Sequence, residues 1–425
     1  MTERLTPLAL SLLAVAAWAL ALGVLAARPE LFVAALPLLI PLGALARPSR
    51  APDYRLTHEV SATSLFEHEA VAVTILVEAR SSIALMDVFE PLPEGAALAA
   101  GHNRAVLTLS PGEKARLRYE LRWPGRGVRV LGTVHVRVRD TWGLRAWECS
   151  HGAQTRVRVY PHVASVRSLP RPRRTRASVG DHVSRGLGEG LEPGDIRPFA
   201  PGDRVRRVNW PASLRRGALH VTERQQERSA DVVLMLDTLA EVGPAAGTTL
   251  DLSVRAAAAL ATAYLGQRDR VGLIEYGGLI HWVRPGTGRA QYERLADSLL
   301  RARVVFTYVA KDLALVPPRV LPSQALVIAV TPLLDPRLAA AATDLAGRGF
   351  DVVVIAVSPV AVTRAALPRS PATDLACRLW TIERRAMLAD LRGRGLWVLE
   401  WNPADPLEQA LAATRRRRPP LPVAG

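Results

Sequence analysis

The sequence predicts a mixed α/β protein, in which a doubly wound α/β domain follows a small all-β sandwich domain and an N-terminal transmembrane helical hairpin. Three observations support this prediction. The first 50 residues hold two uncharged apolar runs, residues 55–160 alternate apolar and polar positions, and residues 230–415 alternate apolar strands with helices. With 425 residues, 49% of them hydrophobic, the chain can form more than one core.

The N-terminal segment, residues 1–50, carries the membrane prediction. No charged side chain occurs from Leu5 to Ala27, and at ~1.5 Å per residue this run extends ~35 Å, enough to cross a bilayer's hydrocarbon core. The second run, Leu31 to Ala46, is shorter and contains Pro37 and Pro41, so it either spans a locally thinned bilayer or inserts only in part. A cleaved signal peptide is the alternative, but a second apolar run so soon afterwards favours a hairpin of two helices.

The distribution of arginines predicts the orientation of the hairpin. Arg47, Arg50 and Arg55 follow the second run, whereas Arg28 between the runs is balanced by Glu30. Because positive charge stays on the cytoplasmic side, both ends of the hairpin should lie there. We therefore expect a multi-pass protein of the cell membrane with cytoplasmic soluble domains and the lipid bilayer as one partner.

The pattern over residues 55–160 predicts a β-sandwich domain. Apolar and polar side chains alternate in short runs such as Val134 to Arg139, and turn signals such as Pro111-Gly112 and Pro124-Gly125 separate the runs. The expected role of this domain is that of a spacer or docking module. Residues 164–180 follow as a basic linker, with arginines among prolines and no acid to balance them, which suits a solvated segment or one facing lipid headgroups.

The α/β domain is expected over residues 230–415, and a basic, proline-containing tail over residues 415–425. Its first strand begins at Asp231 and ends at Asp237, and in such folds the loops at the carboxyl ends of the strands form the site. The other expected strands are 270–276, 279–283, 325–330, 351–357 and 396–401, and the expected helices are 250–265, 291–302, 336–346 and 382–391.

Charge and cysteine content exclude several classes of function. The net charge of +16 comes almost entirely from arginine, since Lys114 and Lys311 are the only lysines, which indicates a GC-rich genome rather than nucleic-acid binding. Binding of nucleic acid through Arg171–Arg176 and Arg415–Arg418 remains an alternative. Cys149 and Cys377 have no metal-ligand or redox spacing, so we expect free thiols.

Asp237 stands where a von Willebrand factor A-like domain, which the sequence resembles here, places the first residue of an Asp-x-Ser-x-Ser metal motif. Leu239 and Glu241 occupy the two serine positions, so the hydroxyls that orient a divalent cation are missing. Thr287 and Asp335 lie in loops where further ligands would be expected, which leaves a degenerate cation site. The alternative is that Asp237 only accepts backbone hydrogen bonds at the end of its strand; we expect no cofactor.

The segment over residues 181–229 contains two Pro-Gly-Asp tripeptides, at 193–195 and 201–203, each of which predicts a tight turn. Here the sequence resembles the bacterial domain-of-unknown-function 58 proteins, and the order of the predicted parts is similar as well. Asn209 and Pro211 depart from the pattern, since that family more often has His and Lys there. The residues that carry the resemblance are Asp195, Arg197, Phe199, Pro201, Gly202, Asp203, Arg206 and Trp210.

These motif residues allow two interpretations. Ion pairs between the aspartates and arginines, with Phe199 and Trp210 as apolar anchors, would fasten the segment to the sheet. Alternatively the segment is a partner-docking surface, because Arg and Trp dominate interface energies. A single Trp beside a strand is usually part of a core, so Trp210 is expected to be buried. The segment has no Ser-His or Cys-His pair and no Gly-rich loop ending in Lys, so we do not expect an enzyme.

The sequence as a whole indicates a membrane-anchored, cytoplasm-facing interaction or scaffold protein. The family resemblance implies a partner, a MoxR-type AAA+ ATPase, and a role with it in the assembly or maturation of other protein complexes. A metal-dependent hydrolase that uses Asp237 and Asp335 is the alternative. Three converging carboxylates would favour the hydrolase, whereas carboxylates that are each paired with an arginine would favour the scaffold.

Overall fold

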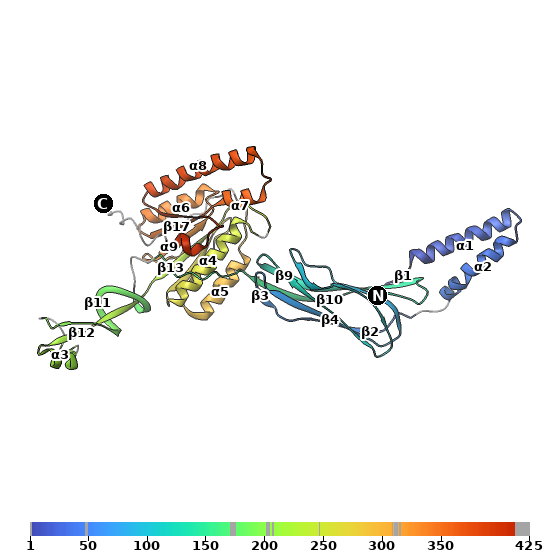
Figure 1. Ribbon diagram of the computed structural model, residues 1–425, viewed down its shortest axis with the longest axis horizontal. Coiled ribbons are helices and arrows are strands. Elements are labelled where there is room, and N and C mark those ends of the chain that lie inside the picture. The colour runs from blue at the N-terminus through green and yellow to red at the C-terminus, as the bar shows by residue number, and fades with distance from the viewer. Residues whose placement is uncertain are drawn as a thin grey trace. The chain divides into compact units, whose positions relative to one another are not determined.

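The computed structural model describes residues 2–46, 50–170, 176–200, 205, 208–245, 247–307, 309, 313 and 316–412; at residues 46, 153, 176–196 and 222–229 it describes the backbone alone. The chain forms two compact units, Met1–Tyr160 and Pro161–Gly425. The predicted α/β character is confirmed, since helices and several sheets are both present. Figure 1 labels many of these elements.

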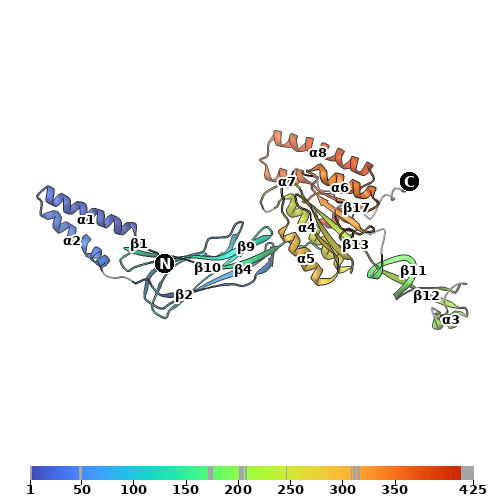
Figure 2. The same cartoon turned by 180° about the vertical axis from the view of Figure 1, so that it is seen from behind.

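Two apolar helices lie near the beginning of the first unit, α1 (Pro7–Leu25) and α2 (Glu30–Gly43), followed by the short 3₁₀ helix η1 (Ala44–Ala46). They lie side by side in both views (Figures 1 and 2). Ala9, Ala16 and Gly23 are buried at seven-residue intervals on one face of α1, and a Cβ on Gly23 would lie 3.2 Å from the Phe32 ring of α2. Small residues therefore permit close packing of the two helices. Among the described residues, α1 alone is long and apolar enough to span a membrane.

Within the described residues of the first unit, ten strands form two sheets. One sheet has the order β1-β10-β9-β5-β7, with β3 paired to β10, and the other has the order β2-β4-β8-β6. The inward-facing residues of both sheets share one apolar core, which includes Val73, Val136 and Trp123. The strands are β1 (Thr2–Leu5), β2 (Tyr54–Val60), β3 (Ser64–Phe66), β4 (Ala70–Ala79), β5 (Ile83–Phe89), β6 (Ala97–Gly101), β7 (Arg104–Leu109), β8 (Lys114–Arg122), β9 (Gly127–Arg139) and β10 (Arg145–Tyr160).

A buried carboxylate, Glu90, lies in this core and is fully hydrogen-bonded. It accepts bonds from Tyr119 Oη at 2.5 Å and from the Gly132 N–H at 2.7 Å, and His58 Nε2 lies 3.0 Å from it. Burial alone would raise the pKa of Glu90, but the bonds from His58, Tyr119 and Gly132 outweigh burial and lower it. Glu90 thus stays charged inside the sandwich because donors surround it.

The second unit is built on a six-stranded sheet with the order β15-β14-β13-β16-β17-β18. All neighbouring pairs are parallel except β14 with β15, which is antiparallel. Its strands are β13 (Asp231–Thr238), β14 (Arg270–Gly277), β15 (His281–Gly286), β16 (Leu326–Thr331), β17 (Asp351–Val357) and β18 (Trp397–Trp401). All eight residues of β13 are buried, as the unbroken apolar run predicts for a central strand.

Helices cover both faces of this sheet. The apolar residues of α4 (Thr249–Gly266), α5 (Gly288–Arg301) and α9 (Leu407–Ala412) pack on one face, and those of α6 (Pro336–Gly347) and α8 (Pro371–Gly393) on the other. Figures 1 and 2 show α4 and α5 together on one face, opposite α6 and α8. Helix α7 (Pro359–Ala366) was not predicted, and α8 begins eleven residues before the predicted start at Ile382, with Ser370 as its N-cap.

The segment before the sheet differs from the predicted linker. Val166 and Leu169 are buried in the core beneath α4, and the Tyr264 hydroxyl donates to the Pro170 carbonyl at 2.6 Å. Residues 164–170 are therefore packed against the α/β unit, whereas residues 171–175 lie outside the described part of the chain. Next come β11 (Arg176–Pro198), α3 (Trp210–Arg216) and β12 (His220–Ser229), in which β11 and β12 pair as a two-stranded sheet.

Candidate functional site

The candidate site lies where the chain reverses its direction across the sheet. From the central strand β13 the order runs outward to β14 and β15 on one side and to β16, β17 and β18 on the other. In open α/β sheets, sites usually form at the carboxyl ends of the strands where the order reverses. Asp237, near the end of β13, and Thr331, at the end of β16, are both placed there.

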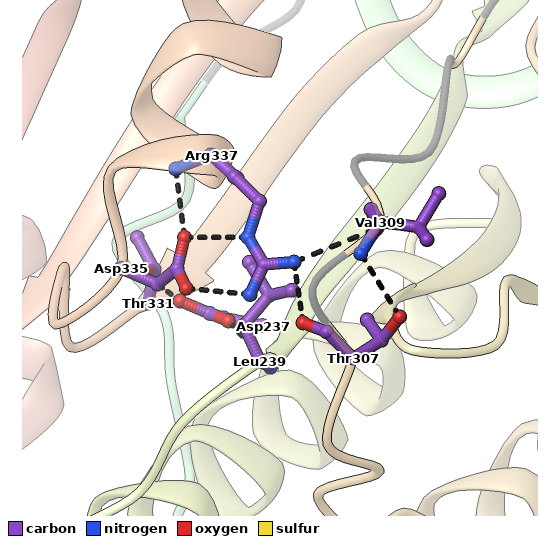
Figure 3. Close-up of polar contacts among 7 residues, drawn as sticks. All are labelled: Asp237, Leu239, Thr307, Val309, Thr331, Asp335 and Arg337. Atoms are coloured by element: carbon purple, nitrogen blue, oxygen red, sulfur yellow. Dashed lines mark hydrogen bonds and ion pairs between the residues drawn. The ribbon is translucent and has the colours of Figure 1, made fainter.

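Asp237 is the buried centre of this cluster (Figure 3). Its side chain accepts a hydrogen bond from the Leu239 N–H at 3.0 Å and another from the Thr331 hydroxyl at 2.5 Å. Thr331 in turn accepts a bond from the Leu333 N–H at 2.8 Å. The carboxylate thus ties together the two loops that follow β13 and β16. The alternative role for Asp237 named backbone donors alone, whereas one of the two donors is the Thr331 side chain.

Burial determines the protonation of Asp237. With 1% of its surface exposed, the carboxyl has its pKa raised to about 6, because burial disfavours the charged form. The bonds from Thr331 and the Leu239 N–H lower the pKa but do not outweigh burial. Nearby Asp335 raises it further, whereas Arg337 lowers it.

Asp335 is paired with an arginine. It is the N-cap of α6, where it accepts from the Arg337 N–H, and the Arg337 guanidinium donates to both of its oxygens, at 2.9 and 2.7 Å. This two-bond ion pair lowers the pKa of Asp335, and it is about four-fifths buried. The same guanidinium also donates to the Thr307 carbonyl at 2.8 Å (Figure 3). A fixed cation therefore already neutralises Asp335.

Thr287 does not join this cluster. It follows β15, whose last residue, Gly286, pairs with Val271 near the beginning of β14. Asp237 pairs with Tyr276 near the other end of β14. Since β15 runs antiparallel to its neighbour, its carboxyl end lies at the edge of the sheet opposite to Asp237. The structure therefore brings Asp237 and Asp335 together but places Thr287 elsewhere.

The arrangement is that of an ion-paired and hydrogen-bonded cluster rather than of converging metal ligands. Within the described residues, no group of three His, Cys, Asp or Glu side chains is placed to hold a metal ion. Asp335 satisfies the condition that favours a scaffold, because Arg337 neutralises it. Asp237 has no arginine hydrogen-bonded to it in the described contacts and relies on neutral donors instead.

Sequence reasoning missed three residues of this cluster, Thr307, Thr331 and Arg337. Thr331 had a usable signal, since it is the polar residue that ends a buried strand next to the strand of Asp237. Arg337 had a weaker signal. If Asp335 is the N-cap of a helix, Arg337 is the second residue of that helix and lies close to the Asp335 carboxylate. Thr307 had none, because it belongs to a loop that only the folded chain brings to Arg337.

The family motif forms a small helix with an outward apolar face. Asn209 caps α3 by accepting from the Ala212 N–H at 3.0 Å, and buried Ser213 binds the Asn209 carbonyl and the His220 N–H. Trp210 and Leu214, four residues apart, are 57% and 82% exposed. The prediction that Trp210 is buried is therefore wrong, because the backbone of the motif, rather than this ring, fastens α3 to β12.

The remaining motif residues are only partly described. Arg197 donates to the Pro198 carbonyl at 3.0 Å, and the Phe199 N–H donates to the Leu219 carbonyl at 2.8 Å. Pro193 and Gly194 lie within β11, beside a break in the register with β12, so the turn predicted there is wrong. The side chain of Asp195 is outside the described part of the structure, as are Pro201, Gly202, Asp203 and Arg206 as a whole.

Comparison with known proteins gives a family but no activity. An uncharacterized protein of Mycobacterium tuberculosis, Rv1480, is 33% identical over 138 residues, which are 32% of this chain and 44% of that protein. The uncharacterized Bacillus subtilis protein YeaD is 26% identical over 213 residues, 49% of this chain and 53% of YeaD. The matched parts thus span about half the length of these relatives.

A solved structure, the CARDB domain of a Pyrococcus furiosus protein with di-metal ions, covers 27% of this chain and 97% of its own at 10% identity, but with a TM-score of 0.18 it supports no argument. The family model described as "Protein of unknown function DUF58" matches residues 195–376, which include both α3 and the Asp237 cluster. The resemblance of the motif is thereby confirmed: residues 195–376 of this chain match the DUF58 family.

Proposed function

We propose that this protein is a membrane-anchored, cytoplasm-facing interaction protein that works with a MoxR-type AAA+ ATPase in the assembly or maturation of other complexes. The partner comes from the family resemblance. The proposed docking surface is α3, and the observation that carries this proposal is the exposed pair Trp210 and Leu214 on one face of that helix.

The way α3 is held supports docking over a purely structural role. The side chains of Asn209 and Ser213 form hydrogen bonds with backbone groups of the same segment. These bonds hold the helix in place without a contribution from the Trp210 ring. Gly217 ends the helix at a φ of 66°, a conformation that glycine adopts without strain. A short helix that is capped at both ends and exposes a Trp and a Leu is typical of an interface anchor, because such side chains gain from burial against a partner.

The α/β unit is proposed to be von Willebrand factor A-like, with a second apolar surface beside the Asp237 cluster. The strand order and the antiparallel edge strand β15 suit that fold. Gly278 approaches Val305 so closely that no Cβ would fit, so the loop after β14 lies against the loop that contains Thr307. Leu279, Phe306 and Val309 on these loops are exposed. Exposed apolar side chains beside a cluster in which Arg337 already pairs with Asp335 suit protein contact better than hydrolysis.

Strand pairing supports a two-pass anchor. Strand β1 precedes α1, whereas its partner β10 belongs to the β-sandwich that follows α2. Strands of one sheet lie on one side of a membrane, so if α1 crosses the bilayer, the chain must return before residue 54. Helix α2 and η1 together extend roughly 27 Å, close to the ~30 Å of a hydrocarbon core.

Partner capture by the full-length protein in detergent tests the docking surface. Trp210→Ala should weaken capture of the MoxR-type ATPase by ~1–4 kcal/mol, as truncation of an interface anchor does, while leaving the denaturation midpoint within experimental error. Leu375→Ala is the matched control, because Leu375 is 58% exposed but lies on α8. This control variant should bind like the unmodified protein.

Unchanged capture by Trp210→Ala would reject α3 as the docking surface. A lowered denaturation midpoint together with unchanged capture would mean that the motif stabilises the fold and does not bind the partner. Equal weakening by Leu375→Ala would show that the assay responds to general loss of apolar surface rather than to α3.

A further inference from the structure

We propose that the loop Asp140–Arg145 of the β-sandwich is a membrane-contact site, which lies at the headgroup level of a phospholipid bilayer with Trp142 in the interface. This inference rests on the proposed membrane anchor. It adds that the sandwich is not tethered loosely to the hairpin but is fixed on the bilayer surface through this loop.

The loop holds the beginning of α1. The Thr6 N–H donates to the Leu144 carbonyl at 2.9 Å, and the Thr6 hydroxyl donates to the Gly143 carbonyl at 2.6 Å. Thr6 is also the N-cap of α1, where its oxygen accepts from the Ala9 N–H. Immediately before it, β1 pairs residue by residue with the beginning of β10, from Leu5 with Arg145 to Thr2 with Glu148. The chain therefore enters α1 directly from the edge of the sheet.

The same loop holds the end of the second helix. The Arg145 guanidinium donates to the Leu45 carbonyl in η1 and lies 3.3 Å from the Glu3 carboxylate. Its side chain is largely buried in these contacts. Arg145 thus joins both ends of the hairpin, which fixes the helices to the sandwich at two points. A single flexible connection would allow the sandwich to tilt, whereas two fixed points restrict that motion.

The length of α1 sets the depth of the loop. Its 19 residues extend ~28 Å, nearly the thickness of a bilayer's hydrocarbon core, so Thr6 at its beginning should lie at the boundary with the headgroups. Gly143 is close to the first turn of α1, since a Cβ on it would lie 3.9 Å from Leu8 Cδ2. The residue next to Gly143 in the chain is Trp142, which must therefore lie near the same level.

Trp142 is presented on a fixed turn. Asp140 accepts from the Leu144 N–H at 2.7 Å and the Arg145 N–H at 3.0 Å, and the Gly143 N–H donates to the Asp140 carbonyl at 3.0 Å. Gly143 adopts a φ of 68°, which closes the turn. At its tip Trp142 is 56% exposed. An amphipathic aromatic ring held beside a membrane helix is suited to the interface, where Trp is enriched in membrane proteins.

Depth-dependent quenching in the full-length protein tests this inference. In a Cys149→Ser, Cys377→Ser background, single cysteines replace Thr141, Val15 or Ser64, receive an environment-sensitive fluorophore, and the protein is reconstituted in phosphatidylcholine–phosphatidylglycerol vesicles. Thr141 is exposed beside Trp142, which this variant keeps, and Val15 is an exposed apolar position in the middle of α1. Ser64 pairs with Arg158 at the far end of β10, thirteen residues from Arg145, so it is roughly 40 Å from the loop.

We expect a lipid with a headgroup spin label to quench the fluorophore at residue 141 at least ~3-fold more than at residue 64, and Trp142→Ala to reduce that difference, because Trp prefers the interface. A tail-labelled lipid should quench the fluorophore at residue 15. Equal, weak quenching at 141 and 64 with strong quenching at 15 would overturn the contact site and leave the anchor standing.

Two other outcomes would also overturn the inference. No quenching at residue 15 would remove the membrane anchor itself, and the contact site with it. A fluorophore at residue 141 that neither the lipid label nor aqueous iodide quenches would mean that protein, such as a second copy of the chain, covers the loop.

Discussion

At the scale of single residues, Asp237 combines deep burial with only neutral hydrogen-bond donors. Its pKa in the folded protein is raised from 3.8 to about 6, so the folded state binds this proton more tightly than the unfolded state does. The stabilisation from this proton is therefore fully present below about pH 4 and is lost as the pH rises to about 6. A shift of this size corresponds to ~3 kcal/mol.

Asp237→Asn should remove this pH dependence, because the amide stays neutral and can keep the contacts to Leu239 and Thr331. The unmodified protein should lose ~3 kcal/mol of unfolding free energy through this group between about pH 4 and pH 7, and the variant should not. The variant should therefore gain ~3 kcal/mol relative to the unmodified protein over that range. Hydrogen exchange of the β13 amides measures this within the α/β unit. Parallel pH profiles for the two proteins would contradict the raised pKa.

The Asp335–Arg337 pair leads to a second prediction at this scale. Because Arg337 neutralises Asp335, and Leu239 and Glu241 stand in place of cation-orienting hydroxyls, millimolar Mg²⁺ should raise the melting temperature by less than ~1 °C. Thermal melts with and without the ion test this. A clear increase that Asp237→Ala abolishes would restore the cation site.

The sequence reveals part of this cluster because strand ends can be recognised from composition. Asp237 and Asp335 each border a predicted element, and parallel strands bring their carboxyl ends to one edge. It does not reveal that Arg337 reaches Thr307, because that contact depends on the path of a loop without periodic pattern. Thr287 was assigned to the cluster because an antiparallel edge strand cannot be told from a parallel one by its apolar run alone.

At the scale of elements, α8 is fastened to the sheet by a buried cation. Arg384 is 4% exposed and donates to the Pro332 carbonyl at 2.7 Å and the Val357 carbonyl at 2.8 Å. These carbonyls lie at the ends of β16 and β17, beside the Asp237 cluster. Arg384→Met should lower the free energy of unfolding by ~2–5 kcal/mol, since two buried carbonyls would lose charged donors.

Arg394→Ala, at the C-cap of the same helix, is the control. Arg394 forms an exposed pair with Asp390, four residues earlier, so its loss should cost less than ~1 kcal/mol. Urea unfolding combined with hydrogen exchange of the β16 and β17 amides measures both variants. Similar small effects from the two substitutions would mean that apolar packing alone holds α8.

Element boundaries were predictable where one face alone is buried and unpredictable where both faces carry apolar residues. Helix α6, which buries Leu338, Ala342 and Leu345 on one face, begins at its predicted start and ends one residue after its predicted end. Helix α8 exposes Leu375, Leu379 and Ile382 opposite its buried face, which obscures the helical period in its first turns. Strand β1 escaped prediction for another reason. Four residues, Thr2 to Leu5, show no alternation, and only their partner β10 makes them a strand.

At the scale of the whole molecule, the pairing of β1 with β10 restricts the topology more strongly than the arginine distribution does. The pairing requires Thr2–Leu5 and the β-sandwich to share one side of the membrane. With α1 across the bilayer, the connection at Arg28 must lie on the opposite side. A single-pass anchor would instead place Arg28 and the sandwich on the same side and would separate β1 from β10.

Cysteine accessibility in intact cells distinguishes the two topologies. In a Cys149→Ser, Cys377→Ser background, the proposed cytoplasmic side of the segment after α2 predicts that a membrane-impermeant maleimide labels Arg28→Cys from outside and labels Ser64→Cys only after lysis. Both sites are exposed, so access alone does not separate them. Labelling of Ser64→Cys in intact cells, with the same rate as Arg28→Cys, would mean that α2 does not return across the bilayer, and the two-pass anchor would have to be abandoned.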